Sequence, residues 1–495
     1  MKYLRPVMLA GTGSDVGKSV LATALCRIFV QDGYRPAPFK AQNMALNSYA
    51  TPDGREIGRA QAVQAEACRL APHVDMNPLL LKPNSDHTSQ VVLLGKPIGN
   101  FSARQYWTEK TLNFRDEACK AFDRLAAQYS PIVLEGAGSI SELNLRDHDL
   151  VNLPMARHAD AAVILVADID RGGVFASCYG SIMLQEPEDR ARIRGIIVNK
   201  FRGDISLFEE GRKLLEKVCG VPVLGVVPYL KDVHIDAEDS VALEGKREKG
   251  KVKREKRLEE NSEKGKEKSE QCGGGFVNVV VVKLPHISNF TDFDALERDA
   301  RVRLIYGEGP EDIEAADIVI LPGTKATLSD LDHLRRSGMA GAVLRAHDAG
   351  KTVMGICGGY QMLGQSIVDP QGVEGVAGAS VHGLGLLPIT TTMAEEKTTR
   401  QVTFDFDGHA CHGYEIHQGQ STATTPFVIH DRCIGTYIHG CLDNAPVRDF
   451  LIGRPATSAD TLSPEAFRQQ QYDLLAEHVR RYVDIPRLYD ILTKK

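Results

Sequence analysis

The sequence predicts an α/β protein with two domains, each built on a mostly parallel sheet. Short apolar runs alternate with helix-compatible stretches, the pattern of parallel strands joined by crossover helices. At 495 residues the chain is too long for one typical core. A highly charged segment, residues 244–271, interrupts the alternation near the middle of the chain. These three observations together indicate two α/β halves separated by a linker.

Composition argues against several classes of function. The formal net charge is −6, with 43% hydrophobic and 25% charged residues, so we expect neither a nucleic-acid nor a membrane partner. No apolar run reaches the roughly 18 residues that a transmembrane helix needs. The short apolar run at the N-terminus leads into a glycine-rich loop and not into a cleavage site. Ten scattered cysteines without a CxxC pair favour a reduced, cytoplasmic protein without a zinc site or disulfide framework.

We predict a first domain over residues 1–240, a linker over 241–275, and a second domain over 276–495 that ends in a helical tail. The linker holds only two apolar residues between positions 244 and 271 and cannot bury a core. A basic RNA-binding tract is the alternative, and the interleaved acidic residues disfavour it. Strand-like runs in the first domain lie at 6–11, 37–41, 131–136, 161–168, 194–200 and 222–229, with helices expected at 18–32 and 59–71. Those of the second domain lie at 276–284, 316–323, 351–357 and 433–440.

A phosphate-binding loop follows the first strand. Residues 11–19 read GTGSDVGKS and precede an apolar helical stretch. Glycines let the backbone N–H groups face an anion at the helix N-terminus, Lys18 would reach the outer phosphates, and the Ser19 hydroxyl would ligate Mg²⁺. The alternative is a plain strand-to-helix turn, which the order strand, loop, helix makes the weaker interpretation. The expected nucleotide contacts here are Gly11, Thr12, Gly13, Gly17, Lys18 and Ser19.

Three further side chains fit around this loop. Glu135 ends the strand PIVLE, where a carboxylate can ligate or orient the metal. Lys40 follows another strand and is a candidate phosphate contact, although lone lysines are usually solvated. Asn199, in IIVNK, is a candidate contact to the base. The loop at 168–177 has the composition of an anion cradle or of an ordinary turn, and the sequence does not choose between them.

A second site centres on Cys357. The stretch VMGICGGYQMLG places this thiol between a strand and a helix, with glycines on both sides. The positive end of a helix favours a thiolate, and the N–H of Gly358 can face an oxyanion, with a second donor expected near Gly323. His439 ends a late strand and would serve as the base. For the cysteine alone, packing in the core is the commoner role. The glycine-flanked turn together with the strand-end histidine favours the nucleophile.

Both halves resemble known families. GTGSDVGKS and EGAG resemble the dethiobiotin-synthetase branch of P-loop NTPases, although Thr12 stands where the first glycine of the usual motif belongs. GICGGYQMLG with His439 resembles the class I glutamine amidotransferases, whose domain is flavodoxin-like. Many members continue His-Pro-Glu, whereas this chain reads His-Gly-Cys, so the third member of the triad stays open. Glu415 is a candidate.

The combination resembles the cobalamin-pathway amidases. PFKAQNMALNS, KLPHISNFTDFDAL, LPGTKATLSDL and HGYEIHQG are similar to the cobyric acid synthase family. That resemblance implies ATP- and Mg²⁺-dependent amidation of the b, d, e and g carboxylates of adenosylcobyrinic acid a,c-diamide, through acyl phosphates and with ammonia from glutamine. The corrinoid, glutamine and ATP would be its partners, with no flavin or metal cluster.

Two alternatives are open. The related amidase that modifies the a and c carboxylates shares both domain types, and PFKAQNM and NFTDFD argue against it. A nonenzymatic P-loop switch of the chromosome-partitioning kind, with a decayed glutaminase domain, is the other. Those switches carry a second lysine early in the phosphate loop, where this chain has only Gly11 to Gly13.

Overall fold

The computed structural model describes residues 3–84, 88–108, 113–230, 233–236, 276–455 and 462–493. The predicted linker at 241–275 lies outside the described residues. The chain forms two compact units, and neither is contiguous in sequence. The first contains Met1–Met44, Ile57–Asp236 and Leu462–Lys495, and the second contains Ala45–Glu56 and Ala237–Thr461. This division differs from the predicted linear boundaries, because the C-terminal tail belongs to the first unit and a short N-terminal segment belongs to the second.

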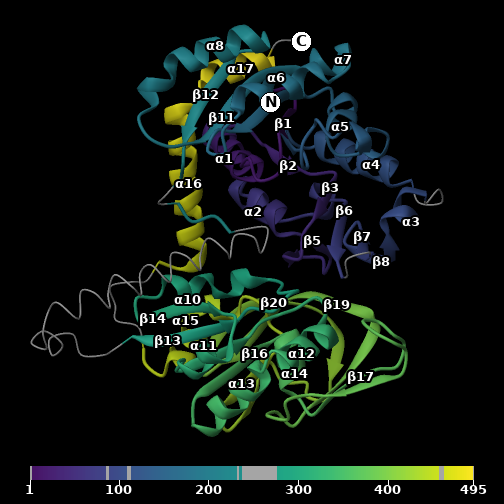
Figure 1. The fold of residues 1–495 in the computed structure, drawn as a ribbon, viewed down its shortest axis with the longest axis vertical. Coiled ribbons are helices and arrows are strands. Elements are labelled where there is room, and N and C mark those ends of the chain that lie inside the picture. The colour runs from purple at the N-terminus through teal and green to yellow at the C-terminus, as the bar shows by residue number, and fades with distance from the viewer. Residues whose placement is uncertain are drawn as a thin grey trace, which may run out of the picture. The chain divides into compact units, whose positions relative to one another are not determined.

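The first unit is built on a six-stranded parallel sheet in the order β12-β11-β10-β1-β9-β2, of which Figure 1 labels β1, β2, β11 and β12. Side chains alternate between its two faces, so that Val7 and Leu9 of β1 enter one apolar core while Met8 and Ala10 enter the other. The same alternation along β10 makes every residue of that strand buried, as expected for a sheet covered on both faces. Its strands are β1 (Val7–Gly11), β2 (Ala37–Phe39), β9 (Ile132–Glu135), β10 (Ala162–Asp168), β11 (Ile193–Phe201) and β12 (Val223–Pro228).

Helices cover both faces of this sheet. One core draws residues from α1 (Lys18–Gln31), α2 (Arg59–Ala67), α16 (Pro464–Tyr482) and α17 (Ile485–Thr493). The opposite core draws on α4 (Phe114–Ala126), α5 (Leu153–His158), α6 (Val174–Met183) and α8 (Glu209–Cys219). The remaining helices of this unit are α3 (Ala103–Thr108) and α7 (Pro187–Arg190). The predicted helices at 18–32 and 59–71 correspond to α1 and α2.

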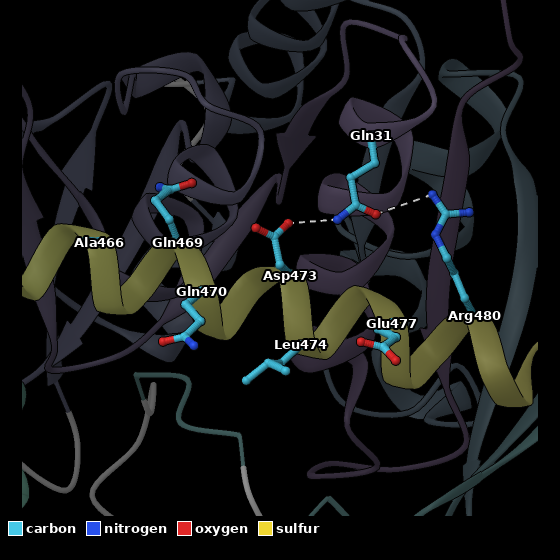
Figure 2. A pocket seen from close by; sticks show the side chains of 8 residues that line it. All are labelled: Gln31, Ala466, Gln469, Gln470, Asp473, Leu474, Glu477 and Arg480. Carbon is cyan, nitrogen blue, oxygen red and sulfur yellow. Dashed lines mark hydrogen bonds between the residues drawn. The ribbon is translucent and has the colours of Figure 1, made fainter. Parts of the chain in front are cut away.

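The C-terminal helix α16 is anchored on α1, and in Figure 1 it lies in yellow among the blue and purple elements of the first unit. Ser463 caps its first turn and Pro464 follows at the first helical position. Arg27 of α1, buried beneath it, makes a bidentate pair with Asp473 at 2.7 and 2.8 Å. Figure 2 shows the polar pocket beside this pair, where Gln31 bridges Asp473 and Arg480. None of the predicted site residues lines this pocket, so it is part of the helix junction.

The second unit contains a six-stranded sheet in the order β14-β13-β15-β16-β22-β21, parallel except for β21. The first five strands follow the 2-1-3-4-5 order of flavodoxin-like sheets, as predicted. One large apolar core surrounds the sheet. The strands are β13 (Val277–Val282), β14 (Val302–Gly307), β15 (Ile318–Leu321), β16 (Thr352–Ile356), β21 (Val428–His430) and β22 (Cys433–Thr436). The α/β class with two parallel sheets is therefore confirmed.

Among the described residues of this unit, the helices are α10 (Asp294–Arg298), α11 (Pro310–Glu314), α12 (Thr327–Arg336), α13 (Met339–Asp348), α14 (Gly358–Leu363) and α15 (Ala445–Ile452). A flanking sheet, which the sequence pattern did not predict, holds β17 (Ser366–Asp369), β18 (Ala379–His382), β19 (Thr390–Phe406) and β20 (His409–Ser421). Smaller sheets are formed by β3 (Gln42–Met44), β6 (Leu79–Pro83), β7 (Thr88–Leu93) and β8 (Lys96–Ser102), and by β4 (Ser48–Ala50) with β5 (Glu56–Gly58). Within the described ranges, no helix is long and apolar enough to cross a bilayer.

Candidate active sites

The phosphate loop lies where the sequence predicts it, between the end of β1 and the start of α1. Gly17 adopts φ 96°, a left-handed conformation that glycine tolerates, and a Cβ there would lie 2.1 Å from Asn199 Nδ2. Lys18 Nζ donates to the carbonyl oxygens of Gly13 and Gly138 at 2.9 Å each. These two bonds hold the ammonium group across the loop. A bound phosphate would take the place of the carbonyls as its hydrogen-bond acceptor.

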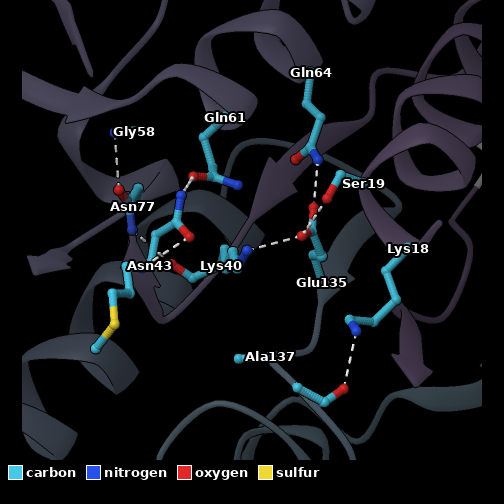
Figure 3. Close-up of polar contacts among 12 residues, drawn as sticks. Lys18, Ser19, Lys40, Asn43, Gly58, Gln61, Gln64, Asn77, Glu135 and Ala137 are labelled. Carbon is cyan, nitrogen blue, oxygen red and sulfur yellow. Dashed lines mark hydrogen bonds and ion pairs between the residues drawn. The ribbon is translucent and has the colours of Figure 1, made fainter. Parts of the chain in front are cut away.

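Four side chains meet at the end of β9 (Figure 3). Glu135, buried at the strand end, accepts hydrogen bonds from Ser19 Oγ at 2.8 Å and from Lys40 Nζ at 2.9 Å on Oε1. Gln64 Nε2 of α2 donates to Oε2 at 2.6 Å. The structure therefore brings together three predicted residues, Ser19, Lys40 and Glu135. Gln64 was not predicted, because an isolated glutamine on a helix carries no motif.

The charge state of Glu135 follows from these neighbours. Burial by itself would raise the pKa of this carboxyl group, but the Lys40 ammonium and the hydrogen bonds from Gln64 and Ser19 outweigh it and lower the pKa. The carboxylate is therefore ionised at neutral pH. With the Ser19 hydroxyl and the buried Gln64 Oε1, which has no hydrogen-bond partner within the described residues, it forms a set of oxygen donors. Hard oxygen donors of this kind fit Mg²⁺.

Asn199 lies against the same loop. Its Nδ2 atom donates to the carbonyl oxygen of Val16 at 2.8 Å, so one amide hydrogen holds the loop that precedes Gly17. In the loop at 168–177, Gly172 and Gly173 both have positive φ, and α6 begins at Val174. Contact of Asn199 with the base stays a prediction, as does an anion in the 168–177 loop.

Cys357 occupies a strained turn between β16 and α14. Its φ is 53° and its ψ is −109°, an unusual conformation for a residue with a side chain, and strain of this kind gathers at functional sites. The glycines that follow Cys357 are required because the backbone here lies too close to neighbouring residues to leave room for a side chain. A Cβ on Gly359 would lie 2.0 Å from Leu321 O, and one on Gly358 would lie 2.6 Å from Thr324 Cγ2 and 3.1 Å from Thr324 N. The turn is therefore pressed against the loop that follows β15.

His439 is fully buried beside this turn and is held by an acid. Its Nδ1 atom lies 2.7 Å from Asp292 Oδ2, and the N–H of Gly440 donates to Asp292 Oδ1 at 2.9 Å. Burial would lower the pKa of His439, but the Asp292 carboxylate and a hydrogen bond with the Cys357 side chain raise it above its ordinary value. A Cβ on Gly323 would lie 3.0 Å from His439 Cε1, which places the predicted oxyanion loop next to the imidazole. The predicted nucleophile and the predicted base thus lie in one unit with a carboxylate that contacts the imidazole.

Comparison with known proteins assigns both units to families. Residues 7–241 match the CobQ/CobB/MinD/ParA nucleotide binding domain, and residues 278–447 match the CobB/CobQ-like glutamine amidotransferase domain. Cobyric acid synthases of Phocaeicola vulgatus and Bacteroides fragilis are each 57% identical to this chain, over 99% of both sequences. The cobyric acid synthase of Salmonella agona is 47% identical over 98% of both. The chain belongs to the cobyric acid synthase family.

As a member of the cobyric acid synthase family, the protein is a glutamine-dependent, amide-forming ligase with a nucleotide-binding domain. The similarity extends over nearly the whole chain and includes both domains, so the alternative of a P-loop switch with a decayed second domain is set aside. Among solved structures, a glutamine amidotransferase aligns with 35% of this chain and 98% of its own, at 18% identity and a TM-score of 0.30. That similarity is too weak to bear on the fold.

The carboxylate that contacts His439 in this member of the cobyric acid synthase family is Asp292, whereas the sequence suggested Glu415 as the candidate third residue. Glu415 pairs with Arg400 at 2.7 Å and lies 3.8 Å from His417, so its carboxylate is engaged away from His439. Asp292 follows β13, Gly323 follows β15, Cys357 follows β16 and His439 follows β22. These four strands are neighbours in a parallel sheet, and their carboxyl ends meet at one edge.

Proposed function

We propose that this protein amidates the b, d, e and g side-chain carboxylates of adenosylcobyrinic acid a,c-diamide, with ATP as the activating reagent and glutamine as the nitrogen donor. The family assignment supports the reaction class, and the relatives named cobyric acid synthase support the substrate. One observation carries the proposal. A single chain holds both a complete Cys357–His439–Asp292 arrangement and a phosphate loop whose Ser19 bonds the strand-end Glu135.

In the glutaminase half, the Cys357 sulfur attacks the carboxamide carbon of glutamine. The thiol proton passes to His439 Nε2, while Asp292 keeps the Nδ1 proton in place and stabilises the imidazolium. His439 then protonates the leaving nitrogen, so that ammonia departs and a glutamyl thioester forms. Water attacks the thioester, His439 takes its proton, and the thiolate leaves as glutamate is released. The N–H groups of Gly358 and the loop at Gly323 are the proposed oxyanion donors.

In the synthetase half, a corrinoid carboxylate attacks the γ-phosphorus of ATP, forming an acyl phosphate and ADP. Ammonia then attacks the acyl carbon and phosphate leaves, giving the amide. The loop from Gly11 to Ser19 would hold the phosphates, with Lys18 and Lys40 supplying positive charge. Ser19 and Glu135 would hold Mg²⁺, which offsets phosphoryl charge when it is bound. Ammonia must reach the acyl phosphate unprotonated, because ammonium has no lone pair for attack.

The substrate is tested by product mass. Purified protein is incubated with ATP, Mg²⁺ and glutamine, and with either adenosylcobyrinic acid a,c-diamide or unamidated cobyrinic acid. We expect the diamide to gain four amide groups and the unamidated corrinoid to be a poor substrate. Amidation of cobyrinic acid that stops at two groups would instead support the sister amidase. ATP turnover without amidation of either corrinoid would contradict the proposal.

A further inference from the structure

The segment Ala45–Glu56 belongs to the second unit, although the residues on both sides of it belong to the first. Its contacts within the second unit are specific. Glu56 pairs with Lys397 at 2.5 Å, with both side chains buried, and Gln401 donates to the carbonyl oxygen of Ala50. Tyr49 packs on Tyr414, with ring centroids 5.2 Å apart. The mechanism proposed above uses no residue of this segment.

The segment reaches the catalytic histidine through Asn289. The backbone N–H of Ser48 donates to Asn289 Oδ1 at 3.0 Å, and Asn289 Nδ2 lies 3.2 Å from His439 Nε2. Asn289 is buried and has φ 53°, a left-handed conformation that asparagine tolerates better than most residues. Since a backbone N–H can only donate, Oδ1 must face Ser48. The amide NH₂ group must therefore face His439, because the Ser48 donor fixes which end of the amide is oxygen.

This orientation affects the proton on His439. The Asp292 carboxylate requires a proton on Nδ1, so the neutral ring has its lone pair on Nε2, where it accepts from Asn289. An imidazolium would place an N–H at Nε2 against the NH₂ donor of Asn289. Asn289 therefore opposes the protonation of His439 that Asp292 and Cys357 favour. It also competes with Cys357 for the Nε2 lone pair that must accept the thiol proton.

Both flanks of the segment are tied to the phosphate site. Lys40, just before it in sequence, and Gln64, just after it, bind the two carboxylate oxygens of Glu135 (Figure 3). The chain between these anchors is the one that contacts Asn289. If nucleotide binding shifts Lys40 or Gln64 at Glu135, the backbone that joins these two residues transmits the shift to Ser48.

We propose that Asn289 is a positioning residue, oriented by the Ser48 backbone, that restrains proton transfer from Cys357 to His439 until nucleotide binding withdraws Ser48. Without that hydrogen bond the amide is free to turn away and leave Nε2 to the thiol. The inference rests on the proposed glutaminase roles of Cys357 and His439. The titratable groups that face His439 are Asp292, Cys357 and Tyr414, and Cys441 in turn faces Asp292.

The test is the rate of Cys357 alkylation by iodoacetamide, followed by peptide mass spectrometry on the full-length protein between about pH 6 and pH 9, a range that brackets ordinary thiol titration. Asn289→Gly removes the amide and tolerates φ 53°. Ser48→Pro removes the backbone donor together with the buried hydroxyl, at the first residue of a strand, where proline is accepted, and Ser48→Ala, which loses the hydroxyl and keeps the N–H, separates the two losses. Asp53→Asn, an exposed change in the same segment, is the control.

We expect Asn289→Gly and Ser48→Pro to raise the alkylation rate near pH 7 roughly fivefold, the ratio for the loss of a hydrogen bond of about 1 kcal/mol, and to move the alkylation midpoint to lower pH. A nonhydrolysable ATP analogue with Mg²⁺ should raise the rate in wild type and add little in Asn289→Gly. An unchanged midpoint in Asn289→Gly, even with lower thermal stability, would overturn the positioning role. No response of wild type to the analogue would overturn the coupling. Failure of the glutaminase roles themselves is distinguishable, since Cys357→Ala would then still release glutamate.

Discussion

The Nδ1 atom of His439 lies 2.7 Å from Oδ2 of Asp292, a residue 147 positions earlier in the chain. The second oxygen of the same carboxylate accepts the N–H of Gly440, which follows the histidine directly. These two bonds fix the imidazole plane and its Nδ1 proton. With Cys357, these two residues form the proposed triad, in which an acid from another crossover of the sheet holds the histidine.

Asp292→Asn should lower glutamine-dependent turnover by roughly 10²–10⁴-fold, because the amide keeps the size of the side chain but neither stabilises the imidazolium nor fixes the tautomer. Amidation driven by ammonium chloride should persist. Glu415→Gln is the matched control, since its carboxylate pairs with Arg400 and should have little effect on glutaminase. A larger loss in Glu415→Gln than in Asp292→Asn would contradict the assigned triad.

Glu135→Gln should separate the two half-reactions. The amide cannot supply the negative charge that Lys40 and a metal ion require, so ATP-dependent amidation should fall at least about 100-fold with either nitrogen source. Glutamate release without ATP should stay at the restrained level proposed for wild type, because Glu135 lies in the first unit and the proposed triad in the second. Parallel assays of glutamate and of corrinoid mass measure both. Undiminished amidation would show that Glu135 has no part in the chemistry.

Lys40→Met should change stability and its dependence on pH. Removing the ammonium leaves Glu135 buried without its cation, at a cost of about 3–5 kcal/mol. In wild type the pKa of Glu135 is lowered, so its stabilisation is present above the unfolded value near 4.5 and is lost as pH falls through the folded value. In the variant, burial outweighs the remaining hydrogen bonds and raises that pKa above the unfolded value, so the group destabilises the fold near neutral pH and this loss is relieved as pH falls through the folded pKa.

Urea unfolding of Lys40→Met across the acid range measures this shift. Adding Glu135→Gln to Lys40→Met is the control, since it removes the buried charge and should restore part of the lost stability. If the free energy of unfolding depends on pH in the same way for wild type and Lys40→Met below neutral pH, the pair does not control ionisation of Glu135.

Gly359→Ala should disrupt the turn at Cys357. The new methyl group would lie 2.0 Å from Leu321 O, a backbone atom of β15 that cannot move without displacing the strand. We expect a lower melting temperature and loss of glutaminase. Gly180→Ala provides a contrast, because nothing lies within 4 Å of its Cβ in α6, and it should stabilise by about 0.5–1 kcal/mol. Equal effects of the two substitutions would contradict the packing described for the turn.

The sequence was sufficient for residues that belong to contiguous motifs. Lys18, Ser19 and Cys357 lie in short patterns whose chemistry is local, and the structure places each where its motif predicts. Asp292 has no such pattern around it. It could have been found from topology, because its loop follows a strand that neighbours those before Gly323 and Cys357, and parallel strands bring their carboxyl ends to one edge.

The domain boundaries show a different limit. Segment Ala45–Glu56 has no apolar periodicity that would assign it to one unit, and its placement depends on specific partners such as Lys397 for Glu56. Helix α16 is anchored by Arg27, more than 400 residues away in sequence. Periodicity predicts that a helix exists, but it does not say which sheet the helix will cover. An apolar face can pack on any sheet of matching shape, and only specific pairs such as Arg27 with Asp473 decide between them.

The most direct test of the account compares wild type with Cys357→Ala, using ATP, Mg²⁺ and the a,c-diamide corrinoid with either glutamine or ammonium chloride. The account predicts that the variant loses glutamate release and glutamine-driven amidation, yet still amidates the corrinoid with ammonia. Continued glutamate release by Cys357→Ala would show that another group is the nucleophile. Loss of amidation from both nitrogen sources in a folded variant would contradict the division into two separate sites.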